Sequence, residues 1–137
     1  MDLHDQALPV QRGKLGVWDN REVLTEPATS ASVPVLWVAQ VARAPDVVAL
    51  SCGGRSMTYR EVEQAANRLA HLLTAHGAGP GGCVAVLFSR CAEAVVAILA
   101  VLKTGAAYLP IDPAVPPARL EFMVGDAAPI AVITTAD

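Results

Sequence analysis

The sequence predicts an α/β fold in which helices flank a mostly parallel sheet. From residue 47 onward, short apolar runs of strand length alternate with longer segments whose apolar residues recur at the helical period. The crossovers between successive runs are long enough to contain a helix, as connections between parallel neighbours are. The order strand, helix, strand, helix, strand, helix, strand therefore indicates a layered α/β sheet.

The chain is expected to begin with a linker and a helix. Residues 1–32 have little periodicity and many turn formers, so they are expected to be a linker or weakly structured segment. A helix is expected from Val33 to Ala44, with Pro34 early in it and Pro45 after its end. Its apolar residues at helical spacing are Val35, Leu36, Val38, Ala39 and Ala42.

A β-hairpin and a capped helix are expected next. Val47–Leu50 reads as a strand and Cys52–Arg55 as a hairpin turn, with the return strand starting at Ser56. Thr58 and Glu61 stand three residues apart, so each side chain can satisfy a free backbone N–H of the other. This capping box predicts that a helix starts at Thr58.

The connection after this helix leads into the most apolar part of the chain. The helix is expected to end at Gly77, and Pro80 prevents it from resuming. The continuous apolar run Cys83–Phe88 predicts a strand that is covered on both faces. Ser89 is expected to cap the next helix, which ends at Gly105.

The remaining segments complete the alternation. A strand is expected over Ala106–Ile111, and Asp112-Pro113 ends it. A short helix is expected from Pro116 through Met123. The last expected strand runs over Ile130–Thr134.

Composition excludes several classes of function. The 137 residues carry 10 basic and 13 acidic side chains without a basic run, which argues against nucleic acid or anionic lipid as a partner. The longest apolar stretch, Ala92–Leu102, falls far short of the roughly 20 residues that a membrane span needs, and the first residues lack the apolar core of a signal peptide. The cysteines are odd in number and widely spaced, so they are expected to be free thiols in a reducing cytoplasm. They are Cys52, Cys83 and Cys91.

A cluster of glycines is the first candidate for a phosphate-binding loop. Such a loop follows a strand and leads into a helix N-terminus, where free N–H groups face the anion. Here the order is reversed, because the glycines follow a helix and lead into a strand. A turn is therefore expected at Gly77, Gly79, Gly81 and Gly82.

Other polar residues also favour structural roles. Arg90 lies near a helix start and is expected to be a solvated residue of its first turn. Lys103 lies in a last helical turn, where a cation offsets the negative end of the helix dipole. Asp112 follows a strand end, where ligands often bind in α/β sheets, but its flanking prolines favour a rigid turn. The histidines His4, His71 and His76 lack metal-ligand spacing, so the residues themselves assign no catalytic, cofactor-binding or metal-binding group.

Two strings in the chain are far more specific than these candidates. They are MTYREV at Met57–Val62 and LKTGAAYLPID at Leu102–Asp112. In order and spacing they resemble the first two core motifs of the amino-acid adenylation domains of nonribosomal peptide synthetases, with mild departures at Val62 and Thr104. The resemblance extends over residues 33–137. It is weak or absent over residues 1–32, which are similar to the linkers that follow a condensation domain.

The resemblance implies that residues 33–137 are an incomplete N-terminal subdomain with the layered fold of adenylate-forming, AMP-binding enzymes. The complete domain of that family activates an amino acid with ATP and Mg as aminoacyl-AMP. It then passes the acyl group to a phosphopantetheine thiol on a carrier domain. The remainder of the adenylation domain and the carrier and condensation domains are thus the implied partners, and an MbtH-like protein that docks on the N-terminal subdomain is another.

The family's phosphate loop, specificity pocket, ribose-binding aspartate and catalytic lysine belong to later motifs that the 137 residues do not contain. The resemblance therefore transfers no catalytic, ATP-binding or metal-binding residue, and the two motifs present are expected to shape and pack the scaffold. The chain by itself is expected to be an inactive fragment, because it lacks fixed donors for the phosphate charge. Two alternatives stay open. The parent could be an acyl-CoA or fatty-acyl-AMP ligase, or the chain could retain a docking surface for an MbtH-like protein.

Overall fold

The computed structural model describes residues 30–135 of the chain. Every element described below lies in one compact unit of the chain, Ala31–Asp137. The expected linker over residues 1–32 therefore lies almost wholly outside the described residues, as does His4. The elements in chain order are α3 (Val33–Arg43), β1 (Val48–Cys52), β2 (Arg55–Thr58), α4 (Tyr59–Ala75), β3 (Cys83–Leu87), α5 (Ala92–Thr104), β4 (Ala107–Ile111), α6 (Pro117–Ala127) and β5 (Ala131–Thr134).

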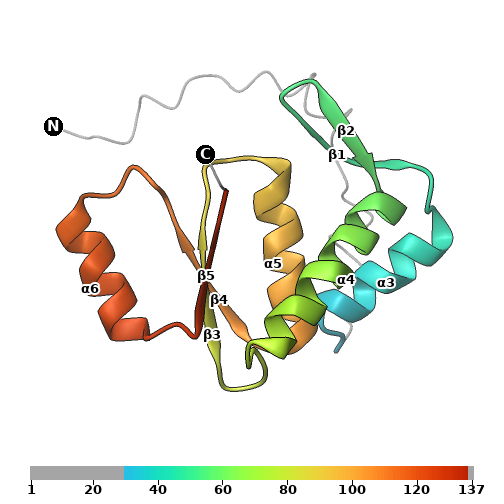
Figure 1. Cartoon of the computed structure of the whole chain (residues 1–137). Coiled ribbons are helices and arrows are strands. Elements are labelled where there is room, and N and C mark those ends of the chain that lie inside the picture. Colours follow the sequence, from blue (N-terminus) through green and yellow to red (C-terminus); the bar gives the residue numbers. More distant parts are fainter. Residues whose placement is uncertain (1–29, 136–137) are drawn as a thin grey trace, which may run out of the picture. The chain divides into compact units, whose positions relative to one another are not determined.

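The predicted α/β fold is confirmed. Three strands form a parallel sheet in the order β4-β3-β5, and β1 and β2 form a separate antiparallel hairpin. The register places Ala85 beside Leu109 on one side and beside Val132 on the other. Figure 1 shows the sheet nearly edge-on, with α5 and α4 on one side of it and α6 on the other.

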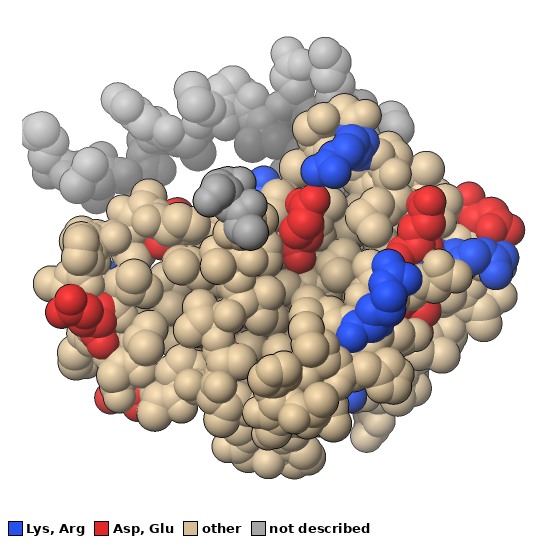
Figure 2. Space-filling view, in the orientation of Figure 1, with Lys and Arg blue, Asp and Glu red and all other residues tan. Residues whose placement is uncertain are grey.

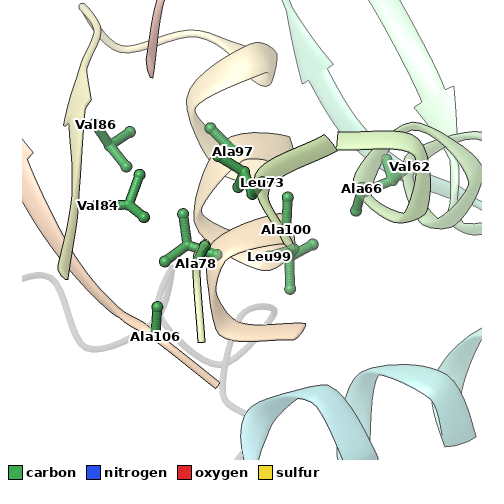
Figure 3. Packing of buried hydrophobic residues seen from close by; sticks show 11 residues of the cluster. Val62, Ala66, Leu73, Ala78, Val84, Val86, Ala97, Leu99, Ala100 and Ala106 are labelled. Carbon is green, nitrogen blue, oxygen red and sulfur yellow. The ribbon is translucent and has the colours of Figure 1, made fainter. Parts of the chain in front are cut away.

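The core lies between the sheet and the pair of helices α4 and α5. Val84 and Val86 point from the central strand β3 toward α5, as Figure 3 shows, and each exposes 3% of its surface or less. Ala85, between them, is also fully buried but points to the opposite face, since successive strand residues alternate. The prediction that this strand is covered on both faces is confirmed.

The start of α4 follows the predicted capping box. The backbone N–H of Thr58 donates to Glu61 Oε2 at 2.7 Å, and the backbone N–H of Glu61 donates to Thr58 Oγ1 at 3.3 Å. At the other end, Gly77 has a φ of 92°, and the N–H of Ala78 donates to the carbonyl of Leu73. Glycine adopts this left-handed conformation without the steric cost that a Cβ imposes, so the helix ends where the sequence predicts.

The predicted hairpin turn Cys52–Arg55 is confirmed: Cys52 and Arg55 pair across it, and its two central residues, Gly53 and Gly54, both have positive φ. Two other predicted boundaries were wrong. Ser89 does not cap α5: its N-cap residue is Cys91, because the residues after β3 turn the chain before the helix begins. The last helix runs four residues beyond Met123 to Ala127, since half-buried residues continue on its inner face.

Helix α3 has the predicted length but presents an unexpected face to the rest of the fold. The apolar residues that predicted the helix lie outward: Val35, Leu36 and Val38 each expose about half of their surface or more. The residue that packs against the buried cluster is Trp37. The sequence pattern thus identified the helix without identifying the side that packs.

Candidate functional site

The glycine cluster forms the connection between α4 and β3. Gly81 has a φ of 81°, and the carbonyl of Gly82 accepts a hydrogen bond from Ala107 N at 2.9 Å, at the start of β4. The cluster enters a strand rather than a helix, so its N–H groups do not add to a helix N-terminus as they would in a phosphate-binding loop. Its geometry is that of a turn that positions β3 beside β4.

Arg90 and Asp112 lie near each other at the carboxyl ends of β3 and β4. They contribute to the lining of a half-open cavity of about 340 Å³, with Phe88 and Ile98 among the apolar residues of its wall. The Oδ1 atom of Asp112 accepts the backbone N–H of Ala114 at 2.9 Å, which supports the rigid-turn interpretation. Arg90 is exposed and precedes α5, so the prediction that it lies in the first turn of that helix was wrong.

Lys103 lies in the last turn of α5, as the sequence predicts. Its ammonium nitrogen lies 2.9 Å from Glu63 Oε1, and the two side chains expose only 12% and 18% of their surface. Sequence reasoning missed this ion pair, because the partners stand 40 residues apart on different helices. The lone Glu63 on the otherwise apolar side of a helix pattern was the one signal that could have indicated it.

Glu63 is the centre of a polar cluster that joins three helices. Its Oε2 atom accepts the indole N–H of Trp37 at 2.7 Å, and its Oε1 atom accepts the amide N–H of Asn67 at 3.1 Å in addition to Lys103. The ring of Trp37 lies against that of Tyr59, with centroids 5.2 Å apart. Burial raises the pKa of Glu63, but the hydrogen bonds from Lys103, Trp37 and Asn67, with the charge of Lys103, outweigh it and lower the pKa overall.

Among the described residues, His71, His76 and the three cysteines do not assemble into a site. His76 is the C-cap residue of α4, and its Nδ1 atom lies 2.9 Å from the carbonyl oxygen of Leu72; His71 is exposed. Within residues 30–135, no three His, Cys, Asp or Glu side chains come together as metal ligands would. The cysteines Cys52, Cys83 and Cys91 are free thiols, as predicted. In the same part of the chain, no helix combines the length and apolar character that crossing a membrane demands.

A broad groove of about 700 Å³ lies between α4, α5, the hairpin and the end of β5. Its floor is apolar and includes Met57, Leu69 and Phe88. At its rim Arg55 and Glu93 form an exposed ion pair at 3.0 Å. The lower part of the face shown in Figure 2 is largely uncharged, and acidic and basic side chains lie mainly over its upper and right-hand parts. The groove offers packing surface, and its lining contains no nucleophile beside a general base.

The two specific strings form junctions between elements. MTYREV runs from the end of β2 into the first turn of α4 and includes the capping box. LKTGAAYLPID runs from the last turn of α5 through Gly105 and along β4. Gly105 has a φ of 82°, and a Cβ at this position would lie 3.1 Å from Pro80 Cγ. Both strings therefore fix how helices join strands, which defines an α/β framework.

The chain belongs to the AMP-binding enzyme family, whose model matches residues 37–137. It is 63% identical over 127 residues to the isonitrile lipopeptide synthase of Mycobacterium tuberculosis (strain ATCC 25618 / H37Rv), a match that covers 92% of this chain and 5% of that protein. It is 47% identical over 90 residues to surfactin synthase subunit 3 of Bacillus subtilis (strain 168), covering 66% of this chain and 7% of that protein. The chain thus spans a small fraction of the curated relatives that it matches.

Solved structures share both the fold and part of the sequence. The nonribosomal peptide synthetase FmoA3 superposes with a TM-score of 0.77 and 32% identity, over 81% of this chain and 12% of that one. The N-terminal subdomain of Klebsiella oxytoca NpsA superposes with a TM-score of 0.69 and 29% identity, over 75% of this chain and 27% of that one. The resemblance to nonribosomal peptide synthetase adenylation domains is confirmed, and the described residues correspond to part of an N-terminal subdomain.

Proposed function

We propose that this chain is the opening part of a nonribosomal peptide synthetase adenylation domain, and that the complete domain activates an amino acid with ATP as aminoacyl-AMP. The observation that carries the proposal is the 63% identity over 127 residues to a peptide synthase, together with the family match over residues 37–137. Crystals of FmoA3, a structural neighbour, exist in AMPPNP-bound and α-methyl-L-serine-AMP-bound forms.

Within that domain the chain is proposed to serve as framework, with ATP and Mg held by residues of later motifs. The loops described above support this role, because the glycine-rich connection leads into a strand and the carboxyl-end cavity contains a single basic residue, Arg90. Electrostatic stabilisation of a transferring group requires fixed donors aimed at the developing charge. No catalytic, cofactor-binding or metal-binding residue is therefore proposed in this chain.

Amino-acid-dependent ATP–pyrophosphate exchange tests both statements. The purified 137-residue chain is expected to give no exchange above a protein-free blank with any of the twenty amino acids. The complete parent domain, assayed in parallel, is expected to exchange with at least one of them. Robust exchange by the short chain would refute the framework role, and a parent domain that adenylates only fatty acids would refute the proposed substrate class.

The proposed partners follow from the same assignment. They are the rest of the adenylation domain, a carrier domain that bears the phosphopantetheine thiol, and a condensation domain joined through residues 1–32 as a linker, all in the cytoplasm. An MbtH-like protein is a further proposed partner, since the exposed apolar side chains of α3 offer surface for docking. Co-purification of a tagged MbtH-like protein with the folded chain tests this, and charge-introducing substitutions at Val35 and Val38 are expected to abolish it.

The acyl-CoA or fatty-acyl-AMP ligase alternative is less well supported. The relatives and structural neighbours described above are peptide synthases and synthetases. They match this chain at 63%, 47% and 32% identity, and FmoA3 also matches it in fold. The peptide-synthetase assignment therefore takes precedence.

A further inference from the structure

Helix α3 is attached to the rest of the fold through very few contacts. None of its residues is buried. Of its 11 residues, all of which the structure describes, Trp37 alone packs against the buried cluster. The rest of its inner side offers only half-buried residues, among them Pro34 and Val41, so the hydrophobic effect holds α3 less firmly than it holds α4 and α5, which both contain buried residues.

The hydrogen bond and the aromatic contact of Trp37 are made to α4, and α3 also lies against α5. The indole N–H of Trp37 donates to Glu63 Oε2 at 2.7 Å, and its ring lies against Tyr59. The second oxygen of Glu63 is held by Lys103 of α5 and by Asn67. Lys103 and Asn67 therefore hold the Glu63 carboxylate in place independently of Trp37. The acceptor keeps its position when Trp37 is released.

A separate set of contacts secures the chain just after α3. The N–H groups of Arg60 and Tyr59 donate to the carbonyls of Pro45 and Val47, at 2.9 and 3.0 Å. The guanidinium of Arg60 also pairs with Asp46 at 3.1 Å. These bonds depend on α4 and not on α3, so they would persist if α3 moved away. The chain then has a natural hinge between Arg43 and Pro45.

We infer that α3 is a detachable helix, that the Glu63 carboxylate is the latch that keeps it docked, and that it opens while α4, α5 and the sheet stay folded. Both family strings contribute to the latch, since Tyr59 belongs to MTYREV and Lys103 to LKTGAAYLPID. Local opening of this kind is expected where few apolar contacts and a few polar bonds set the stability of an element.

Amide hydrogen exchange of the 137-residue chain, read by mass spectrometry on dilute protein, tests the inference. In the unaltered chain, α3 amides are expected to exchange faster than those of α5. Trp37→Phe keeps an aromatic ring, although a smaller one, and removes the N–H donor to the carboxylate. This substitution is expected to speed α3 exchange roughly 10-fold or more, the worth of a hydrogen bond to a charged group, with α5 unchanged. Glu63→Gln is expected to speed it less, because the amide oxygen can still accept from Trp37.

Matched controls separate a latch from a general loss of stability. Glu121→Gln makes the same chemical change as Glu63→Gln, but on the exposed helix α6 and away from the contact between Trp37 and Glu63. It is expected to leave α3 exchange unaltered. Tryptic cleavage after Arg43, followed at nanomolar protein, is expected to rise with α3 exchange, since opening frees the hinge. Equal exchange of α3 and α5 in the unaltered chain would overturn the inference. Equal acceleration of exchange in α3 and α5 by Trp37→Phe would also overturn it. So would the absence of any effect of Trp37→Phe and Glu63→Gln on α3 exchange.

Discussion

One carboxylate, that of Glu63, accepts hydrogen bonds from three side chains that come from three helices. Its net lowered pKa means that the folded chain favours the ionised form. A group whose pKa is lowered on folding stabilises the fold above its ordinary pKa, and this stabilisation is lost as the pH falls through the lowered value. Glu61, whose pKa is lowered first by the backbone N–H of Thr58 and then by its hydroxyl, contributes in the same direction.

The free energy of unfolding is therefore expected to fall on acidification, beginning below the ordinary glutamate pKa. In Glu63→Gln this acid dependence is expected to be shallower, because the substituted group no longer titrates and only others such as Glu61 remain. Urea unfolding between pH 6 and pH 3, followed by Trp fluorescence, gives the comparison. If the free energy of unfolding depended on pH equally in Glu63→Gln and in the unaltered chain, Glu63 would have the same pKa in the folded and unfolded states.

Gly105 provides a second test at the residue scale. Gly105→Ala places a Cβ in the left-handed region and 3.1 Å from Pro80 Cγ, so it is expected to lower the free energy of unfolding by about 1–2 kcal/mol. Gly125→Ala makes the same change inside α6, where nothing lies within 4 Å, and is expected to raise it by up to about 1 kcal/mol. Urea denaturation is expected to show that the two substitutions change the free energy of unfolding in opposite directions. If Gly105→Ala left this free energy unchanged, the result would contradict backbone strain at this position.

The elements show where local signals suffice. Helix α4 begins at its capping box and ends before a left-handed glycine, both of which the sequence shows within a few residues. Helix α5 has no side-chain capping bond, and its start was misplaced at Ser89. The local sequence also did not predict which face of α3 packs against the fold, because this face is determined by contacts of Trp37 with Glu63 and Tyr59 of another helix.

Two threonines, Thr58 at the start of α4 and Thr74 near its end, allow the capping box to be tested. Thr58→Ala removes the side-chain acceptor for the N–H of Glu61 and is expected to cost about 1 kcal/mol of unfolding free energy. Thr74→Ala, near the end of the same helix, removes only a hydroxyl bond to the Ala70 carbonyl and is expected to cost clearly less. Thermal unfolding by circular dichroism compares them, and an equal loss for both would argue against a specific cap.

At the scale of the whole molecule, the described sheet has two open edges, β4 and β5. In β4 the N–H of Ala107 points toward β3, so by alternation Pro110 occupies a position that faces the open side. Proline there offers no donor to an added strand. Strand β5 has no such protection, and its Val132 is 50% exposed.

The 137-residue chain is therefore expected to self-associate through β5, because an exposed apolar edge templates further pairing. Val132→Lys is expected to reduce the association in analytical ultracentrifugation without lowering the unfolding midpoint. Val38→Lys on α3 is the matched control and is expected to leave association unchanged. A monodisperse, cooperatively melting parent chain would contradict this prediction, and an effect of Val38→Lys alone would move the interface to α3.

The sequence by itself determined the α/β class, the order of the elements, the cap of α4 and the family, because these depend on periodicity, on pairs a few residues apart and on two uninterrupted strings. It also excluded a phosphate loop at the glycines, since that depends on the order of neighbouring elements. The strand order β4-β3-β5, the outward face of α3 and the pairing of Glu63 with Lys103 were decided by the tertiary structure alone. Each of these depends on which distant residues meet when apolar surfaces are buried, and no local pattern in the chain encodes that meeting.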